Sequence, residues 1–202
     1  VAVRAVHDAK RLAILCTWRD PIVNGATVRV QDFQDAIALQ FSLTTNTPFL
    51  GMGDAKNPVN IWQWKAGWQQ EMDGPRPDMD TIYVSMHWDV YFQTNALYRT
   101  AEAAQNLLAQ PKHVSPVEDA NAHGFGTFTS QPASQQNVKG RGIWRDSHWS
   151  VVFVRDIKSP DAQDAKFAIG KPAQVAFAVW DGENRDRNGR KVISNWLKLM
   201  LE

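Results

Sequence analysis

Alternation of apolar and polar residues predicts β-strands at both ends of the chain. Two alternating runs, 1–6 and 11–18, flank the polar turn Asp8-Ala9-Lys10, which is typical of a β-hairpin. In 35–43 every second residue is apolar, as a half-buried strand requires. Further strands are expected over 26–30, 61–68, 81–88, 149–154, 174–180 and 190–201.

One helix and several loops interrupt these strands. Ala101–Gln110 consists of strong helix formers and ends before Pro111. Loops are expected over 44–58, 73–80 and 112–142. Many short strands with one or two short helices predict a mostly β protein, an antiparallel β-sandwich. We expect a single domain over 1–202, with 69–142 as a loop and helix excursion between its halves.

Composition narrows the class of protein. The 202 residues are 44% hydrophobic and 21% charged, which fits one globular domain. A formal net charge of +1 provides no field that would favour nucleic acid. No apolar run is long enough to span a membrane. The first residues lack the layout of a signal peptide, but a chain that opens inside a strand is compatible with lost upstream residues, so export stays open.

The cysteine and histidine content excludes several kinds of site. Cys16 is the only cysteine and lies in an apolar run, where we expect it to be buried. A single cysteine excludes an intrachain disulfide, covalent c-type haem, and cysteine-ligated zinc and iron–sulfur clusters. Neither Gly-x-Ser-x-Gly nor His-Glu-x-x-His occurs, so we assign no catalytic residue.

Met52 lies in an unusual loop, Gly51-Met52-Gly53-Asp54. Methionine is most often a core residue that fills irregular space. Here the flanking glycines would let the backbone approach a flat ligand closely. A thioether is also a suitable ligand for haem iron and raises its potential. The pattern alone leaves both interpretations open.

Two lysines could contribute a second ligand. Lys191 shares an apolar face with Ile193 and Leu197, so its side chain must reach solvent, form an ion pair or lose its proton. Only the neutral amine can bind a metal. Lys65 is the alternative. It lies on the strand face opposite to Trp62, so we expect it to point away from the interior, although a register shift of one residue would reverse this.

Five blocks of sequence carry a family resemblance: 49–54, 57–66, 149–155, 177–182 and 187–196. They read FLGMGD, NPVNIWQWKA, WSVVFVR, FAVWDG and RNGRKVISNW. In these blocks the chain resembles the haem b gamma subunit of ethylbenzene dehydrogenase. That family includes the gamma subunits of dimethylsulfide dehydrogenase, of selenate and chlorate reductases, and of related nitrite oxidoreductases. The similarity covers nearly the whole chain, and the blocks with Met52 and Lys191 are the most specific.

The resemblance implies a β-sandwich that holds one haem b, bound non-covalently, with methionine and lysine as axial ligands. We carry these ligands onto Met52 and Lys191, with Lys65 as the alternative second ligand. The side chains expected to wall the porphyrin are Phe49, Leu50, Trp62 and Trp64.

The resemblance also implies an electron-transfer subunit in a periplasmic or other extracytoplasmic complex. Its partners would be an iron–sulfur beta subunit, a molybdenum-cofactor alpha subunit and a soluble redox carrier such as a c-type cytochrome. The competing interpretation is an extracellular carbohydrate-binding β-sandwich, because the nine tryptophans suit a sugar platform. A sugar platform needs exposed tryptophans, whereas Trp62, Trp64 and Trp68 share a strand face that could be core.

Overall fold

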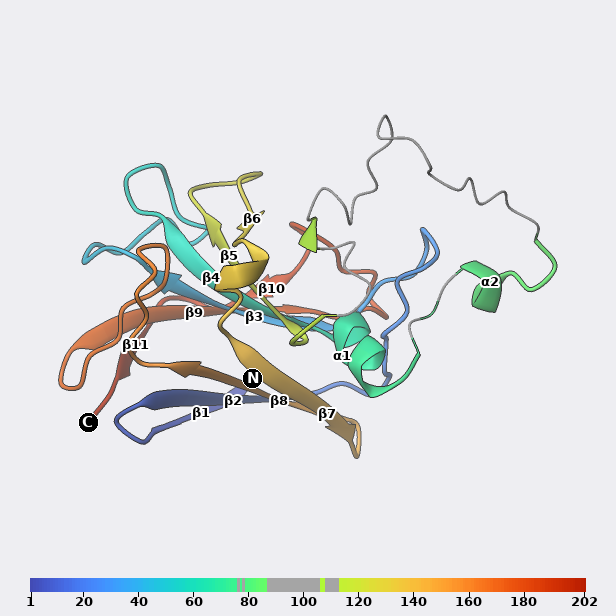
Figure 1. The fold of residues 1–202 in the computed structure, drawn as a ribbon, viewed down its shortest axis with the longest axis horizontal. Coiled ribbons are helices and arrows are strands. Elements are labelled where there is room, and N and C mark those ends of the chain that lie inside the picture. Colours follow the sequence, from blue (N-terminus) through green and yellow to red (C-terminus); the bar gives the residue numbers. More distant parts are fainter. Residues whose placement is uncertain (76, 78, 87–105, 108–112) are drawn as a thin grey trace.

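The computed structural model describes residues 1–75, 77, 79–86, 106–107 and 113–202, and its strands form two stacked antiparallel sheets (Figure 1). Sheet A has the order β1-β2-β8-β7, with β1 (Ala2–His7), β2 (Arg11–Arg19), β8 (His148–Asp156) and β7 (Lys139–Arg145). Sheet B has the order β10-β9-β3-β4-β5-β6, and an additional strand pairs with β9. The predicted mostly β fold, an antiparallel sandwich, is confirmed.

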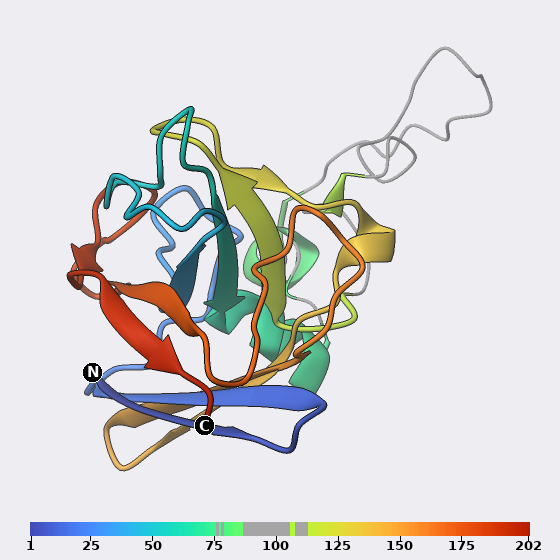
Figure 2. The same ribbon diagram turned by 90° about the vertical axis from the view of Figure 1, so that its left-hand side faces the viewer.

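Sheet B is built around the central strands β9, β3 and β4. Its strands are β10 (Val192–Ile193), β9 (Pro172–Trp180), β3 (Ala36–Ser42), β4 (Val59–Lys65), β5 (Val117–Ala122), β6 (Thr129–Ser130) and the additional β11 (Leu197–Met200). In Figure 2 the two sheets are seen as separate layers, with β1 and β2 below the strands of sheet B. The predicted N-terminal hairpin and the strands over 35–43, 149–154 and 174–180 are confirmed.

Short helical segments interrupt the strands: α1 (Ala66–Asp73), α2 (Met79–Ile82) and the 3-10 turn η2 (Ala133–Gln135). The strand predicted over 61–68 therefore ends early. The chain turns into α1 where the Ala66 amide donates to the Asp35 carbonyl over 2.9 Å. No helix among the described residues is long and apolar enough to cross a membrane.

Three local expectations are wrong. Residues 26–30 form no strand, because Arg29 and Asp32 close a turn through a 3.0 Å backbone hydrogen bond. The strand expected over 81–88 begins as helix α2, and its last two residues lie outside the described ones. The long loop expected over 112–142 contains β5, β6 and β7. The helix predicted over Ala101–Gln110 lies almost entirely outside the described residues.

The polar composition of β5 explains why its strand was missed. Asp119 is fully buried in this strand and accepts a 2.6 Å hydrogen bond from the Asn60 side chain of β4. Glu118 is also buried and pairs with Lys65. These side chains satisfy one another across the sheet, so an interior strand here carries polar residues where the pattern rule expects apolar ones.

Indole rings fill the core between the sheets. Trp62 and Trp64 of β4 are both 0% exposed. Trp64 packs against Trp149 of β8 with ring centroids 4.8 Å apart, and Trp149 in turn stacks on Trp18 of β2. Cys16 is buried in the same core, as expected, and burial raises the pKa of its thiol to about 12. The thiol therefore stays protonated and unreactive at neutral pH.

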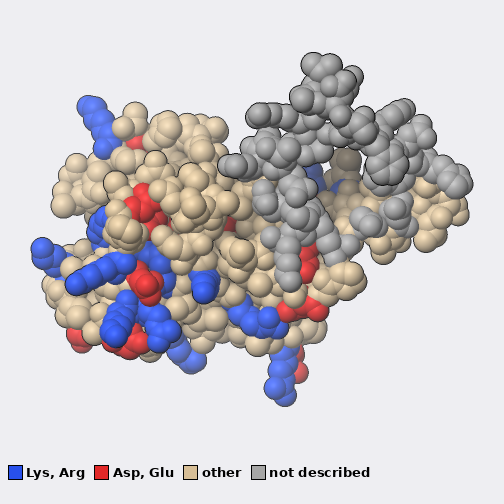
Figure 3. Space-filling model, viewed as in Figure 1, with Lys and Arg blue, Asp and Glu red and all other residues tan. Residues whose placement is uncertain are grey.

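Charges on the surface are mixed. In the space-filling view, Lys and Arg side chains lie among Asp and Glu side chains on the face shown (Figure 3). This distribution agrees with the net charge of +1. It presents no basic stripe on that face of the kind that binds a nucleic acid backbone.

A glycine in β7 tests the packing of the indole core. A Cβ on Gly142 would overlap the Trp64 ring, whereas a Cβ on Gly189 meets nothing within 4 Å. We predict that Gly142→Ala lowers the free energy of unfolding by about 1–3 kcal/mol. Gly189→Ala should change it by less than about 0.5 kcal/mol. Chemical denaturation of both variants measures this, and equal stability of the two would contradict the packing described here.

Candidate functional site

A large pocket lies on the face of sheet B that points away from sheet A. Its volume is about 1480 Å³, which exceeds the range of about 300–1,000 Å³ of most small-molecule sites. Because side chains alternate along a strand, the residues that face this pocket are the ones between the core residues. The strand residues on its floor are Ala36, Ala38, Gln40, Ile61, Gln63, Lys65, Ala176, Ala178 and Trp180.

Alanines form the centre of this floor. Ala38 of β3 lies directly opposite Ala178 of β9, and Ala36 and Ala176 lie beside them. Four methyl groups on two paired strands leave a shallow, flat apolar surface with room for a planar group. No role was expected for these alanines from the sequence. The available signal was the run of alanines on the less apolar face of two alternating strands.

The loop with Met52 overhangs this floor through a tight turn. The Met52 amide donates to the Leu50 carbonyl over 3.0 Å, and the Gly53 amide donates to the Phe49 carbonyl over 2.9 Å. Both Met52 and Gly53 have positive φ, 74° and 76°. This conformation is costly for a methionine, so the surrounding contacts must hold it in place.

Asp54 fixes the far end of that turn. Its carboxylate accepts hydrogen bonds of 3.0 Å from the backbone amides of Lys56 and Asn57, and also from the Asn57 side chain. These donors, with the Asn57 side chain contributing most, hold the pKa of Asp54 below its ordinary value. The carboxylate is therefore ionised at neutral pH, and the Met52 side chain projects from a well-braced loop.

Lys191 meets Met52 in the pocket although 139 positions separate them. Its Nζ lies 4.0 Å from the Met52 Sδ and donates a 3.3 Å hydrogen bond to the Asn188 carbonyl. It also lies 5.0 Å from the centre of the Trp180 ring. Burial lowers the pKa of the Lys191 amine. The pocket thus favours the neutral amine, the form that can bind a metal.

The separation of the two atoms suits a metal between them. With bonds of about 2.3 and 2.0 Å, a sulfur and a nitrogen that share one metal ion can be at most about 4.3 Å apart. The observed 4.0 Å between Sδ and Nζ lies within this limit. Met52 and Lys191 could therefore ligate one metal with little movement.

Lys65 also lines the pocket, which corrects the expectation that it points away from the interior. That expectation assumed one buried face for the strand, whereas sheet B is covered on both faces. Lys65 forms a buried ion pair with Glu118 and lies 4.2 Å from the Trp68 ring centre. Glu118 also accepts a hydrogen bond from Ser130. The Lys65 ammonium is therefore engaged by a carboxylate.

Of the four side chains expected to wall the porphyrin, two line the pocket and two do not. Phe49 and Leu50 line the pocket beside Met52. Trp62 and Trp64 lie instead in the core between the sheets and do not reach the pocket. Trp180 is the indole on its wall, and sequence analysis did not single it out. Ile193 and Leu197 were predicted to share a strand face with Lys191. Ile193 lines the pocket with Lys191, but Leu197 does not.

Known proteins are similar to this chain over nearly its whole length. A family model described as ethylbenzene dehydrogenase matches residues 1–192. The chain is 27% identical to the chlorate reductase subunit gamma of Ideonella dechloratans, over 98% of the chain and 64% of that protein. It is 26% identical to the dimethylsulfide dehydrogenase subunit gamma of Rhodovulum sulfidophilum, over 98% of the chain and 58% of that protein.

A third relative is named as a candidate respiratory nitrate reductase heme subunit of Haloferax mediterranei. The two are 27% identical over 96% of the chain and 53% of that protein. The chain therefore spans between about half and two thirds of the length of the curated relatives that it matches.

The ion pair on the pocket floor leads to a stability prediction. Lys65→Met leaves the buried Glu118 carboxylate without its cation, and we expect the free energy of unfolding to fall by about 3–5 kcal/mol. Adding Glu118→Gln to that variant removes the unpaired charge and should restore most of the loss. Urea unfolding of the single and double variants measures both. A single variant as stable as the parent chain would show that Glu118 does not hold Lys65.

Proposed function

The chain belongs to the ethylbenzene dehydrogenase family, and we propose that its pocket holds one haem b, without covalent attachment, for electron transfer. The observation that carries this proposal is the approach of Met52 Sδ to Lys191 Nζ, 4.0 Å apart above a floor of alanines. A relative named as a heme subunit supports it further. The chain itself contributes no catalytic residue in this proposal.

Met52 and Lys191 are the proposed axial ligands. The turn at Met52 directs a thioether into the pocket, and burial of Lys191 favours the uncharged amine. When bound, haem supplies a one-electron carrier whose potential depends on its axial ligands and on burial. Lys191 suits the second position better than Lys65, because the Lys65 amine is already paired with Glu118.

The rest of the pocket offers surfaces that suit a porphyrin. Phe49, Leu50 and Trp180 supply apolar wall, and the alanine floor gives flat contact. Arg187 lines the same pocket and could pair with a carboxylate of a haem, whereas Arg29, which also lines it, is already paired with Asp32. The Arg187 guanidinium is held in position, because it lies 4.1 Å from the Phe33 ring centre and one of its nitrogens donates to the backbone carbonyls of Val30 and Asp32.

We further propose that the chain works inside an extracytoplasmic oxidoreductase complex. Two relatives are named as gamma subunits, of chlorate reductase and of dimethylsulfide dehydrogenase, which supports the presence of other subunits. By resemblance these are an iron–sulfur beta subunit and a molybdenum-cofactor alpha subunit. A soluble carrier such as a c-type cytochrome would exchange electrons with the haem in the periplasm or an equivalent compartment.

The carbohydrate-binding alternative has less support. A sugar platform requires indole faces on the surface. Every tryptophan that the structure describes is buried or half-buried, including Trp62, Trp64 and Trp68. The pocket is also walled largely by aliphatic and phenyl groups instead of a row of exposed indoles.

Removal of the thioether tests the ligand assignment. We predict that Met52→Ala, in the complex loaded with haem, changes the optical spectrum and lowers the reduction potential, because the thioether raises that potential. Met72→Ala is the matched control, since Met72 is 39% exposed on α1 and does not line the pocket. Redox titration followed by absorbance measures the effect. A Met52→Ala protein with the parent spectrum and potential would exclude Met52 as a ligand.

A bulky substitution on the floor tests where haem lies. Ala178→Leu adds three carbons to the centre of the pocket, so we predict at least a tenfold loss of haem affinity while the chain stays folded. Ala2→Leu, on the exposed strand β1, should bind haem like the parent. Haem uptake followed at the Soret band, with circular dichroism to verify folding, measures this. A pyridine haemochrome assay on the parent identifies haem b, and an unaltered affinity in Ala178→Leu would argue for another site.

A further inference from the structure

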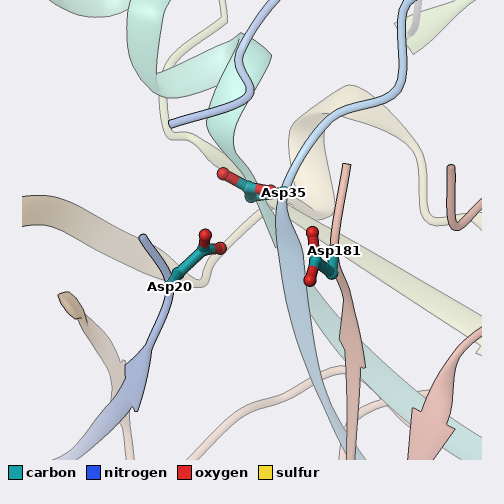
Figure 4. Close-up of side chains that lie close together, drawn as sticks. All are labelled: Asp20, Asp35 and Asp181. Atoms are coloured by element: carbon teal, nitrogen blue, oxygen red, sulfur yellow. The ribbon is translucent and has the colours of Figure 1, made fainter. Parts of the chain in front are cut away.

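Three aspartates converge at the end of the sandwich where the two sheets meet (Figure 4). Asp20 follows β2 of sheet A, Asp35 precedes β3 of sheet B, and Asp181 follows β9 of sheet B. One carboxylate oxygen from each lies within 4.8 Å of the other two. The three side chains come from distant parts of the chain, so only the tertiary fold assembles them.

Two of these carboxylates are deeply buried without a counter-charge. Asp20 is 3% exposed and Asp35 is 0% exposed. Among the residues that the structure describes, neither they nor Asp181 forms an ion pair. Buried charges are normally paired or bound to a metal, because their desolvation is otherwise very costly.

Acceptor atoms in and beside the cluster also lack partners. Asp20 Oδ2 is buried and has no hydrogen-bond partner, although Oδ1 accepts a hydrogen bond from the Ile22 amide over 3.2 Å. Burial raises the pKa of Asp20, and this effect outweighs that of the buried Trp18 indole N–H, which also lacks a partner and acts on this carboxylate to lower its pKa. Asn24 Oδ1, on a side chain that lies close against Gly182, is likewise buried and unsatisfied. Two orphaned oxygens next to three carboxylates indicate that a donor or a cation belongs here.

Neutral donors hold Asp35 in position without neutralising it. Its Oδ1 accepts from the Gly182 amide over 2.9 Å, and its Oδ2 accepts from the Asn24 amide over 2.8 Å. The Trp149 indole also donates to Oδ2, over 3.0 Å. Burial nevertheless raises the pKa of Asp35 to about 6. The carboxylate is thus oriented by the fold while its charge remains uncompensated.

We propose that Asp20, Asp35 and Asp181 bind one divalent cation, with Ca²⁺ as the preferred ion. All the ligands are oxygens, which suit hard cations rather than softer transition metals. Two oxygens bound to one Ca²⁺ can be up to about 5.2 Å apart, against about 4.2 Å for Mg²⁺. All three aspartate oxygens lie within 4.8 Å of one another, so every pair already fits inside the limit for Ca²⁺. Asn24 Oδ1 is an additional candidate ligand.

A cavity borders this cluster, although none of the three aspartates lines it. The cavity, of about 850 Å³, is lined by Asn24, Trp149, Gly182 and Glu183, all of which adjoin the cluster. Asp181 itself is only partly buried. The remaining coordination positions of a Ca²⁺ could therefore be filled by water from this cavity.

The cation would join the two sheets and both segments that border the haem pocket. Residues 20–35 contain Arg29 and Phe33, and the segment after Asp181 leads through Arg187 to Lys191. This site does not depend on haem, because none of the three aspartates lines that pocket. Binding should therefore stabilise the fold with or without haem.

The first experiment measures ion binding by the full chain after treatment with a chelator. Terbium serves as the probe, because Trp149 contacts Asp35 and can sensitise its luminescence. We expect Tb³⁺ emission on tryptophan excitation that Ca²⁺ displaces at much lower concentration than Mg²⁺. Ca²⁺ should also raise the thermal midpoint of unfolding, since a ligand that binds only the folded state stabilises it.

Substitutions identify the ligands. Asp20→Asn and Asp181→Asn should each weaken Ca²⁺ binding at least about tenfold, because loss of even an outer partner of a metal ligand costs about 10–100-fold. Glu202→Gln is the control. It removes one negative charge at an exposed position that belongs neither to the cluster nor to the cavity beside it, so the affinity of this variant for Ca²⁺ should be unchanged.

Thermal unfolding with and without a chelator distinguishes a cation site from the alternative, in which the three carboxyl groups are protonated and bind no ion. Without the ion, Asp20→Asn removes an uncompensated buried charge and should be as stable as the parent or more so; with Ca²⁺, the parent should become the more stable. No stabilisation of the parent by Ca²⁺, or equal stabilisation of Asp20→Asn, would overturn the proposal. Because neither readout uses haem, failure here leaves the haem proposal unaffected.

Discussion

Burial of both faces of sheet B is the constraint on which the rest of this structure depends. One face packs the indoles of Trp62 and Trp64 against sheet A, and the opposite face forms the floor of the pocket. A sheet covered on one side only would expose Ala38, Ile61 and Lys65 to water. Instead the loop around Met52 and the segment around Lys191 enclose them, which creates a site of low polarity.

The same constraint gives the proposed ligands their chemistry. An exposed lysine amine is protonated at neutral pH, whereas burial lowers the pKa of Lys191 toward the form that binds a metal. Lys65 lies on the same floor, but it is paired with Glu118. Two lysines in one pocket thus have different roles because one of them has a carboxylate partner and the other does not.

Much of the fold was predictable from the sequence, because strands in which large apolar residues alternate with small or polar ones are marked by that alternation. β2, β3, β8 and β9 follow that rule. β5 does not, because its polar residues Glu118 and Asp119 are buried. Glu118 forms an ion pair with Lys65, and Asp119 accepts a hydrogen bond from Asn60. Such pairing is a tertiary property, so the pattern of single residues cannot reveal it. The end of β4 at Lys65 has a similar cause, because a backbone contact to Asp35 turns the chain.

For the site, the resemblance directed attention to Met52 and Lys191, and the structure brings the two side chains together. It was harder to predict which face of each strand points toward the pocket. Trp62 and Trp64 looked like porphyrin walls because tryptophan suits flat ligands, yet they face the other sheet. Alanines of β3 and β9 form the floor instead, and a small side chain gives no signal of its function until its neighbours are known.

Iron-edge X-ray absorption on the haem-loaded complex tests the central claim most directly, provided that the signal of the haem iron is isolated from that of other iron centres. A haem iron with only nitrogen ligands would differ from the proposed one in a single neighbouring atom, a nitrogen in place of the Met52 sulfur. With Met52 and Lys191 as ligands, the iron should show one sulfur neighbour at about 2.3 Å, the length typical of a metal–sulfur bond, with nitrogens in the other positions. A first shell of nitrogen alone would contradict the account.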